Sequence, residues 1–336
     1  MTAPASAGGL SERAAQAGTP PLLDLRAISV TLAGEEGAAT ILDRVSLSLG
    51  HGEVLGVVGE SGAGKSMTGA AVIGLLEPPL ALTGGEIRLD GVRIDNLPER
   101  EMRRVRGRRI GMIFQDPLTS LNPVMTIGHQ LIETIRQHSD RDKRQAREQA
   151  IALLGDVGIP SPADRLSSYP HEFSGGMRQR VVIALARAGD PELIVADEPT
   201  TALDVSIQAQ IIALLKEVAA RRGAGVLIIT HDLGVIAEIA DRVAVMYAGR
   251  VVEMAPIEDI LRRPAHPYTR ALMGSIPTLG QRRDTLPQIP GAMPQPAARP
   301  PGCAFHPRCP ERLARCDAVR PELEAKRGGE VACWAV

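Results

Sequence analysis

The sequence GESGAGKS, Gly59 to Ser66, constrains this chain more than any other stretch. It follows the apolar run VLGVV and precedes KSMTGAAVIGLL, whose apolar residues recur at helical spacing, so we expect a loop between a buried strand and a helix. Glycines let backbone N–H groups curl around phosphate oxygens, and the helix N-terminus favours negative charge. The pattern predicts a nucleotide site in which Lys65 reaches the β- and γ-phosphates and Ser66 ligates Mg²⁺. The expected contacts come from Gly59, Ser61, Gly62, Ala63, Gly64, Lys65, Ser66 and Met67.

Acidic residues follow a second apolar run. The sequence LIVADE ends in Asp197 and Glu198, and carboxylates at the end of a buried strand are costly unless a charged group uses them. Beside a phosphate-binding loop, Asp197 can hold Mg²⁺ and Glu198 can activate a water molecule, so both carboxylates have a role. In the same way, IITHD places His231 just after another apolar strand, where it is expected to approach the γ-phosphate.

The order of apolar runs predicts an α/β fold. Residues 22–56 alternate short β-type runs with Gly-rich turns, and the stretch from about 123 to 187 is helix-like. The runs at 193–196 and 225–230 have the length and branching of buried parallel strands. Between them, residues 207–223 predict a crossover helix that ends at Gly223. Strand, helix and strand in this order indicate a mostly parallel sheet.

Composition excludes several classes of protein. A net charge of −1 over 336 residues gives no global basic field, so we expect no nucleic-acid partner. No apolar run approaches the roughly 18 residues that a membrane span needs. Residues 1–20 lack the apolar core of a signal peptide and are expected to form a disordered leader. The chain is therefore expected in the cytosol, where a partner can still hold it at a membrane.

These motifs, taken with three others, resemble the ATP-binding subunit of an ABC transporter from about Leu22 to the C-terminus. FSGGMRQR, residues 173–180, is similar to the ABC signature, and Gln115 in IFQDPLTSLNP is similar to the Q-loop. Residues 201–204, TALD, are similar to the D-loop, and His231 to the H-loop. The resemblance implies a P-loop NTPase domain of ABC type with an antiparallel β subdomain, a helical subdomain at about 118–187 and a cysteine-containing C-terminal extension.

The resemblance also implies residue roles. Glu198 would be the general base, Asp197 and Gln115 would serve Mg²⁺ and the attacking water, and His231 would stabilise the γ-phosphate. Asp204 would signal across a dimer interface. The residues expected to be catalytic are Lys65, Gln115, Glu198 and His231, and those expected to ligate Mg²⁺ include Ser66 and Gln115. Ser174, Gly175 and Gly176 would meet the ATP that the phosphate loop of a second ATPase subunit holds.

Two departures from the family pattern stand out. There is no Phe, Tyr or Trp before Phe114, and Leu32 occupies the place of the aromatic residue that commonly stacks on adenine in this family. Adenine contact is then expected to be apolar, with a loss of about 1 kcal/mol of stacking. The signature carries Phe173 and Met177, where LSGGQ is the commoner form.

The C-terminal region resembles the peptide/nickel importer branch of the family. HPYTRALMGSIP, residues 266–277, is followed by a Pro-rich stretch to about 302 and then by GCAFHPRCP. HPYT alone is equally typical of a helix-capping turn. The Pro-rich stretch is expected to be a linker or an irregular extended segment that separates the tail from the core. We expect the domains to span 21–265 and 266–336.

All four cysteines, Cys303, Cys309, Cys316 and Cys333, lie in the final 34 residues. The spacing lacks the C-x2-C pairs of common zinc modules, and a cytosolic setting disfavours disulfides. The resembled branch has members with a [4Fe–4S] cluster in this extension, which implies four thiolate ligands here. Structural zinc and unligated thiols remain the alternatives.

The resemblance implies a set of partners: a second ATPase subunit, with a distinct chain favoured over a copy, two membrane-spanning permease subunits and an extracytoplasmic substrate-binding protein. The protein would lie on the cytoplasmic face of the inner membrane and power import of di- or oligopeptides. Residues 121–123 would lie near the permease. Import of nickel or another small solute is one alternative, and a soluble ABC ATPase without a transport role is another.

Overall fold

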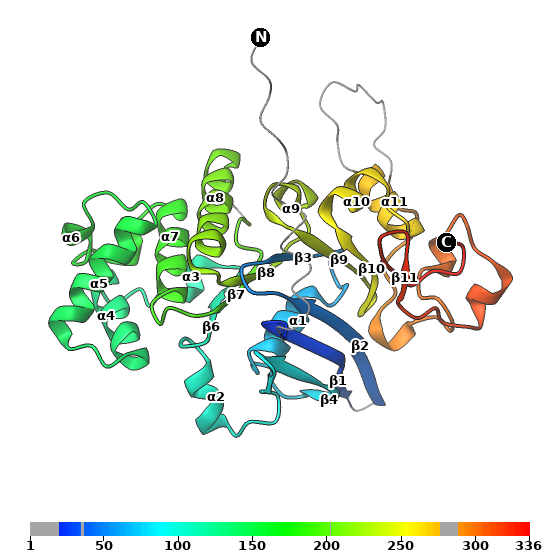
Figure 1. The fold of residues 1–336 in the computed structure, drawn as a ribbon, viewed down its shortest axis with the longest axis horizontal. Coiled ribbons are helices and arrows are strands. Elements are labelled where there is room, and N and C mark those ends of the chain that lie inside the picture. The colour runs from blue at the N-terminus through cyan, green and yellow to red at the C-terminus, as the bar shows by residue number, and fades with distance from the viewer. Residues whose placement is uncertain (1–19, 35–36, 202, 276–287) are drawn as a thin grey trace, which may run out of the picture.

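The computed structural model describes residues 20–34, 37–201, 203–275 and 288–336 (Figure 1). The expected leader lies outside the described residues apart from Pro20, and so does Ala202 of the expected D-loop.

A sheet of eight strands runs through the described part of the chain in the order β11-β12-β10-β9-β3-β8-β7-β6. The strands β9, β3, β8, β7 and β6 are parallel neighbours, whereas β10, β12 and β11 join antiparallel. Their bounds are β3 (Val54–Val58), β6 (Ile110–Ile113), β7 (Leu193–Asp197), β8 (Gly225–Ile229), β9 (Arg242–Tyr247), β10 (Arg250–Pro256), β11 (Glu324–Lys326) and β12 (Gly329–Val331). The expected mostly parallel sheet is confirmed.

Apolar residues on both faces of this sheet explain why its central strands read as continuous hydrophobic runs. In β7, Leu193 and Val195 enter one core, whereas Ile194 and Ala196 enter the other. This alternation follows from the two-residue period of a strand. Helices therefore have to cover both faces.

One face is covered by α8 (Val205–Arg222), α9 (Leu233–Ile239), α10 (Ile257–Arg262) and α11 (Pro267–Gly274), and the opposite face by α1 (Lys65–Val72) (Figure 1). The predicted crossover helix is α8. It ends where expected, because Gly223 takes a left-handed conformation with φ 65°.

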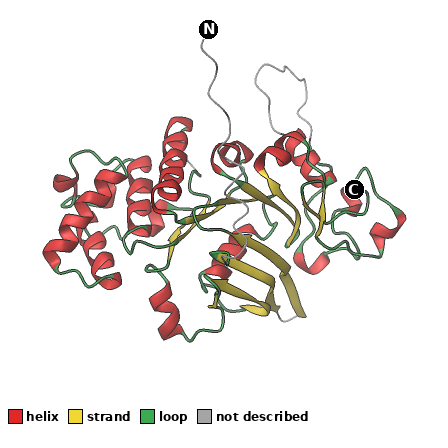
Figure 2. Cartoon of the chain, viewed as in Figure 1, coloured by secondary structure: helices red, strands yellow, loops and turns green. Residues whose placement is uncertain are grey.

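The N-terminal strands form a separate antiparallel sheet in the order β2-β1-β4-β5, seen below the main sheet in Figures 1 and 2. Its strands are β1 (Leu23–Gly34), β2 (Gly37–Leu49), β4 (Leu80–Leu89) and β5 (Val92–Arg93). The helix α1 lies between the two sheets and contacts β2, β7 and β8. Leu32 is half-buried on β1, opposite Ala39 and Leu80.

Helices form a group at one end of the main sheet (Figure 2). They are α3 (Pro117–Ser120), α4 (Ile127–His138), α5 (Lys143–Asp156), α6 (Pro162–Arg165) and α7 (Gly175–Ala186), with η1 (Pro170–Glu172); α2 (Glu99–Val105) precedes them. Thr126 caps α4, and Asp142 forms a capping box with Gln145 at α5. This is the stretch expected to be a helical subdomain.

The C-terminal residues return to the main sheet. Residues 277–287 of the expected Pro-rich linker lie outside the described residues. Composition predicts that the linker holds the tail apart, but β12 pairs with β10 through Glu253 opposite Val331, and Phe305 is buried in the core. The short helices η2 (Pro296–Ala298), η3 (His306–Arg308) and η4 (Ala314–Asp317) lie in this region. Within the described ranges, no helix is long and apolar enough to cross a bilayer.

Candidate active site

The phosphate loop connects β3 to α1 and depends on glycine at both ends. Gly59 has φ 154°, and a Cβ there would lie 2.3 Å from the carbonyl oxygen of Met246. Gly64 has φ 102°, and a Cβ there would lie 2.7 Å from Leu42 Cδ2. Both positions combine a positive φ with close packing, so only glycine fits them. The predicted strand–loop–helix context is confirmed.

Lys65 is folded over this loop. Its Nζ donates to the carbonyl oxygens of Gly59, at 2.9 Å, and Glu60, at 3.1 Å, and the residue is 6% exposed. Burial lowers the pKa of Lys65, against the opposing effect of the Glu198, Asp197 and Glu60 carboxylates. A cation held over a concave, glycine-rich backbone suits an anionic phosphate chain.

Ser66 and Asp197 meet across the site. The Ser66 Oγ donates to Asp197 Oδ1 at 3.0 Å, and Asp197 ends β7. Burial raises the pKa of Asp197, and neighbouring Glu198 raises it further, while Ser66 and Lys65 oppose the shift. A buried carboxylate that is costly to ionise without a counter-charge, beside an exposed hydroxyl, fits a hard divalent cation such as Mg²⁺, which both oxygens can ligate.

Glu198 lies at the centre of a side-chain network. Its Oε2 accepts from Gln115 Nε2 at 3.1 Å and Thr201 Oγ1 at 2.8 Å, and its Oε1 lies 3.1 Å from His231 Nδ1. Burial raises the pKa of Glu198, but its interactions with His231, Thr201 and Lys65 outweigh burial and lower it overall. An ionised carboxylate fixed by three neighbours is suited to accept a proton from water. The structure thus brings together the predicted Gln115, Glu198 and His231.

The signature residues lie elsewhere in the chain. Ser174 caps α7, its Oγ accepting from Met177 N at 3.4 Å, and α7 is well separated from α1 in Figure 1. Among the bonds of the described residues, none joins Ser174, Gly175 or Gly176 to the phosphate loop. Asp204 stands at the N-terminus of α8 without a side-chain capping bond.

Two C-terminal residues that sequence reasoning missed touch the phosphate loop. The Tyr268 hydroxyl accepts from Glu60 N at 2.9 Å, and Arg308 Nη1 donates to Glu60 Oε2 at 3.0 Å. Phe305 packs edge-on against Tyr268, with ring centroids 5.4 Å apart. In the sequence, Tyr268 lies in the HPYT motif and Arg308 lies between Cys303 and Cys309. Neither feature indicates a contact with the phosphate loop.

The HPYT motif also caps a helix. His266 Nδ1 accepts from Tyr268 N at 3.0 Å at the start of α11. Buried Glu253 of β10 accepts from the backbone nitrogens of Ala265 and His266 at 2.7 and 2.9 Å. The motif therefore forms a helix-capping turn and also places the Tyr268 hydroxyl against the phosphate loop.

The cysteines lie in one part of the C-terminal region, where Cys303 N donates to the Cys316 carbonyl oxygen at 2.8 Å. Burial raises the pKa of Cys303 to about 11, and Cys316, Cys333 and Cys309 raise it further. Burial likewise raises the pKa of Cys309 and Cys333, again with contributions from neighbouring thiols. All four thiols are free. Over the described ranges, however, no group of three or more His, Cys, Asp or Glu side chains is placed closely enough to hold a metal ion.

The loop, the Ser66–Asp197 pair and the Glu198 network define a nucleoside-triphosphate-hydrolysing site of the P-loop class. Comparison with known families agrees: the model for the ABC transporter family matches residues 42–201, and that for the oligopeptide/dipeptide transporter C-terminal region matches residues 252–316. The chain belongs to the ABC transporter family, as one of its ATPase subunits.

Named relatives cover almost the whole chain. It is 49% identical to a probable peptide ABC transporter ATP-binding protein, y4tR, of Sinorhizobium fredii, over 93% of this chain and 94% of that protein. It is 46% identical to the dipeptide transport ATP-binding proteins DppD of Bacillus subtilis and Escherichia coli, over 93% and 92% of this chain and 94% of each relative.

Solved structures share the fold. The dimeric, post-hydrolysis structure of the ATP-binding cassette MJ0796 bound to ADP and Pi has a TM-score of 0.63 and 27% identity, covering 70% of this chain and 98% of that one. For cbiO1 from Clostridium perfringens, part of the transporter complex cbiONQ, the TM-score is 0.62 and the identity 24%, over 73% and 92% of the two chains. The expected cassette fold is confirmed.

Proposed function

We propose that the chain hydrolyses ATP to power the import of peptides through a membrane permease. The observation that carries this proposal is the joint presence of the Glu198 network and the C-terminal region, residues 252–316, that matches oligopeptide/dipeptide transporters. The names of relatives that match more than nine tenths of this chain refer to peptide or dipeptide transport.

In this proposal each residue of the site has a definite role. Lys65 and the loop amides bind the β- and γ-phosphates, and Ser66 and Asp197 hold Mg²⁺ with help from Gln115. Bound Mg²⁺ would neutralise the negative charge that develops on the phosphates. The other residues of the loop and of the start of α1 that would contact ATP are Gly59, Ser61, Gly62, Ala63, Gly64 and Met67.

Glu198 takes the proton of the attacking water. Its carboxylate is kept ionised, and Gln115 and His231 hold its two oxygens in a fixed orientation at 3.1 Å. His231 follows β8 by two residues, and in this proposal its imidazole, which lies 3.1 Å from Glu198, also contacts the γ-phosphate. Thr201 supports the same oxygen as Gln115.

A second ATPase subunit completes the site. The separation of α7 from α1 within one chain supports the assignment of Ser174, Gly175 and Gly176 to the ATP of a partner subunit (Figure 1). The dimeric relative MJ0796 supports a paired arrangement, and Asp204 would lie at that interface. We favour a distinct chain as the partner.

The permease would dock beside the Q-loop. Phe114, Leu118 and Val124 are 44%, 61% and 79% exposed, next to residues 121–123. Large apolar side chains exposed in one short stretch are typical of a protein–protein contact. The complex would sit on the cytoplasmic face of the inner membrane, with an extracytoplasmic protein that delivers the peptide.

Uptake of a labelled dipeptide by cells tests this function. Cells whose only copy of this chain carries Lys65→Ala are expected to lose dipeptide uptake, whereas Lys143→Ala, at an exposed helix start, is expected to retain it. Undiminished dipeptide uptake in the Lys65→Ala cells would contradict the proposal. Loss of nickel uptake alone would favour the nickel importer instead.

We also propose that Cys303, Cys309, Cys316 and Cys333 ligate a [4Fe–4S] cluster after a local rearrangement. Four free thiols in one short segment, with Cys303 N bonded to the Cys316 carbonyl oxygen, support it. An absorbance band near about 400 nm with stoichiometric iron in anoxically purified protein is the expected result. Colourless protein containing zinc would overturn the cluster in favour of a zinc site, and metal-free protein would overturn both.

A further inference from the structure

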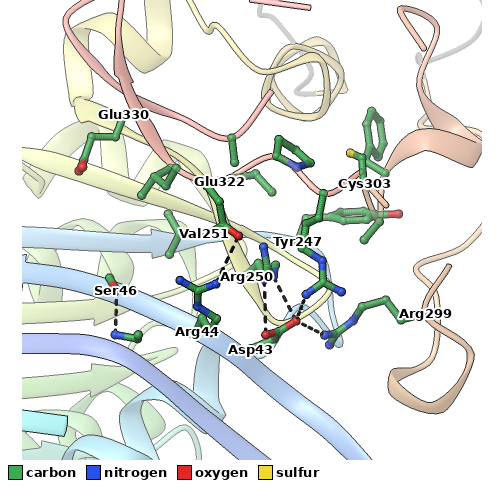
Figure 3. A pocket seen from close by; sticks show the side chains of 18 residues that line it. Asp43, Arg44, Ser46, Tyr247, Arg250, Val251, Arg299, Cys303, Glu322 and Glu330 are labelled. Atoms are coloured by element: carbon green, nitrogen blue, oxygen red, sulfur yellow. Dashed lines mark hydrogen bonds and ion pairs between the residues drawn. The ribbon is translucent and has the colours of Figure 1, made fainter. Parts of the chain in front are cut away.

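Three arginines converge on one carboxylate where the C-terminal region meets β2. Asp43 Oδ2 accepts from Arg250 Nε at 3.1 Å, Arg299 Nη1 at 3.2 Å and Arg320 Nη1 at 2.5 Å (Figure 3). Arg250 belongs to β10, whereas Arg299 and Arg320 come from the C-terminal region. Three positive charges therefore face one negative charge, which leaves an excess of two.

Part of this excess charge is removed from water. The side chains of Asp43, Arg250 and Arg299 are 16%, 15% and 10% exposed, whereas Arg320 is 37% exposed. Unbalanced buried charge is costly unless another group compensates it. Burial lowers the pKa of Arg299, and nearby Arg320 and Arg250 lower it further, against Asp43. Its Nε is buried and has no hydrogen-bond partner among the described residues.

A cavity of about 380 Å³ adjoins the cluster, within the size range of small-molecule sites. Its charged lining consists of the Asp43 cluster with Arg44, Glu322 and Glu330, which makes four positive and three negative groups. Glu322 is paired with Arg44 at 3.4 Å, and Glu330 lies on the side of the cavity away from Arg299 (Figure 3). The end of the cavity at Arg299 therefore remains positive.

Apolar side chains also line the cavity. They come from both parts of the chain and include Val251 and Tyr247 from the sheet and Phe305 and Leu323 from the C-terminal region. A concave site with apolar walls and a few converging donors is the usual form of a site for a small organic ligand. None of the phosphate-loop residues lines it.

We propose that this cavity binds a small organic oxyanion. Its carboxylate or phosphate group meets the guanidinium groups around Asp43, and its apolar part lies against Leu323, an apolar lining residue that is only partly buried. Because Arg250 belongs to the sheet and Arg299 and Arg320 to the C-terminal region, the ligand joins the two and stabilises their contact. This inference does not depend on the transported substrate.

Calorimetric titration tests the proposal, with the phosphate loop saturated by Mg·ADP and ionic strength held constant. The probes are phenyl phosphate and benzoate, with neutral benzyl alcohol as the control. We expect one saturable site for at least one anion with a Kd of about 1 mM or below, and the tighter anion identifies phosphate or carboxylate as the ligand group. No saturable binding of either anion up to about 10 mM, or equal binding of benzyl alcohol, would overturn the proposal.

Substitutions of arginines that line the cavity test whether the anion binds there. Arg320→Gln, at the most exposed of the three arginines, is expected to weaken anion binding at least about tenfold. Arg263→Gln, an 82% exposed surface residue that does not line the cavity, is expected to leave it unchanged. If Arg320→Gln does not fold, as judged by circular dichroism, Arg44→Gln, 61% exposed, is expected to weaken binding about threefold or more. Unaltered affinity in a folded variant of either position contradicts the assignment.

Discussion

Arg308 of the C-terminal region donates to the carboxylate of Glu60, the second residue of the phosphate loop, at 3.0 Å. The Arg308 side chain is 7% exposed and lies over the Tyr247 ring, with its guanidinium carbon 5.8 Å from the ring centroid. Its neighbour in sequence is Cys309. The cysteine-bearing segment is therefore in direct contact with the loop that binds ATP.

Removal of this contact should weaken ATP binding. In Arg308→Ala the Glu60 carboxylate is left uncompensated beside the triphosphate, so we expect a three- to tenfold rise in the Kd for ATP, about 1 kcal/mol. The measurement is titration with a fluorescent ATP analogue. Arg315→Ala, in the same region but stacked on Trp334, is the control and should bind normally.

A second substitution distinguishes the effect of the uncompensated Glu60 charge from a folding defect in Arg308→Ala. Glu60→Gln combined with Arg308→Ala removes the uncompensated carboxylate, so the double variant should bind ATP more tightly than Arg308→Ala alone. If a folded Arg308→Ala protein binds ATP as the wild type does, the pair has no part in positioning the loop.

Loss of the Ser66 hydroxyl should alter the magnesium requirement. The hydroxyl lies 3.0 Å from Asp197, and both are the proposed oxygen ligands, so Ser66→Ala should raise the Mg²⁺ concentration for half-maximal hydrolysis by about tenfold. ATPase rates across a magnesium titration measure this. Ser167→Ala, exposed in the helical group, is the matched control, and an identical titration curve in Ser66→Ala would argue against the ligand role.

Burial of His266 makes folding stability depend on pH. Burial lowers the pKa of His266 to about 3, and Arg270 lowers it further, so the unfolded chain binds a proton more readily than the folded one. Stability should therefore fall as pH falls below about 6.5, with a contribution of about 2 kcal/mol lost between pH 7 and pH 5. Urea unfolding at the two pH values measures the loss.

Asparagine at this position isolates the effect. His266→Asn retains a side chain that can cap α11 but cannot titrate, so its stability should change less between pH 7 and pH 5 than that of the wild type. His129→Asn, at a 63% exposed position, should behave as the wild type. An unchanged pH dependence in His266→Asn would show that other groups cause the loss.

Local patterns were sufficient to predict the phosphate loop, the strand that ends in Asp197 and the strand that precedes His231. Each depends on features within a few residues: the continuous branched apolar run of β7, the crossover helix that ends at Gly223, and the glycines of the loop. Backbone geometry and burial impose these requirements on neighbouring residues, so they can be recognised in a single sequence.

Contacts over long separations could not be predicted in this way. Arg308 and Glu60 are 248 residues apart, and Asp43 and Arg320 are 277 apart. The Pro-rich composition suggested a separated tail, whereas the pairing of β12 with β10 and the burial of Phe305 bring that tail back to the core. Pairing partners of short strands depend on tertiary packing, which leaves no periodic signal in the chain.

The central claim is that Glu198 is the base for ATP hydrolysis in a paired assembly. ATPase turnover of Glu198→Gln, measured on the assembled membrane complex together with ATP-dependent subunit association, tests it most directly. We expect turnover to fall by about 10² or more while association with ATP is retained, and Glu148→Gln, exposed on α5, to behave as the wild type. Wild-type turnover in Glu198→Gln would contradict the account.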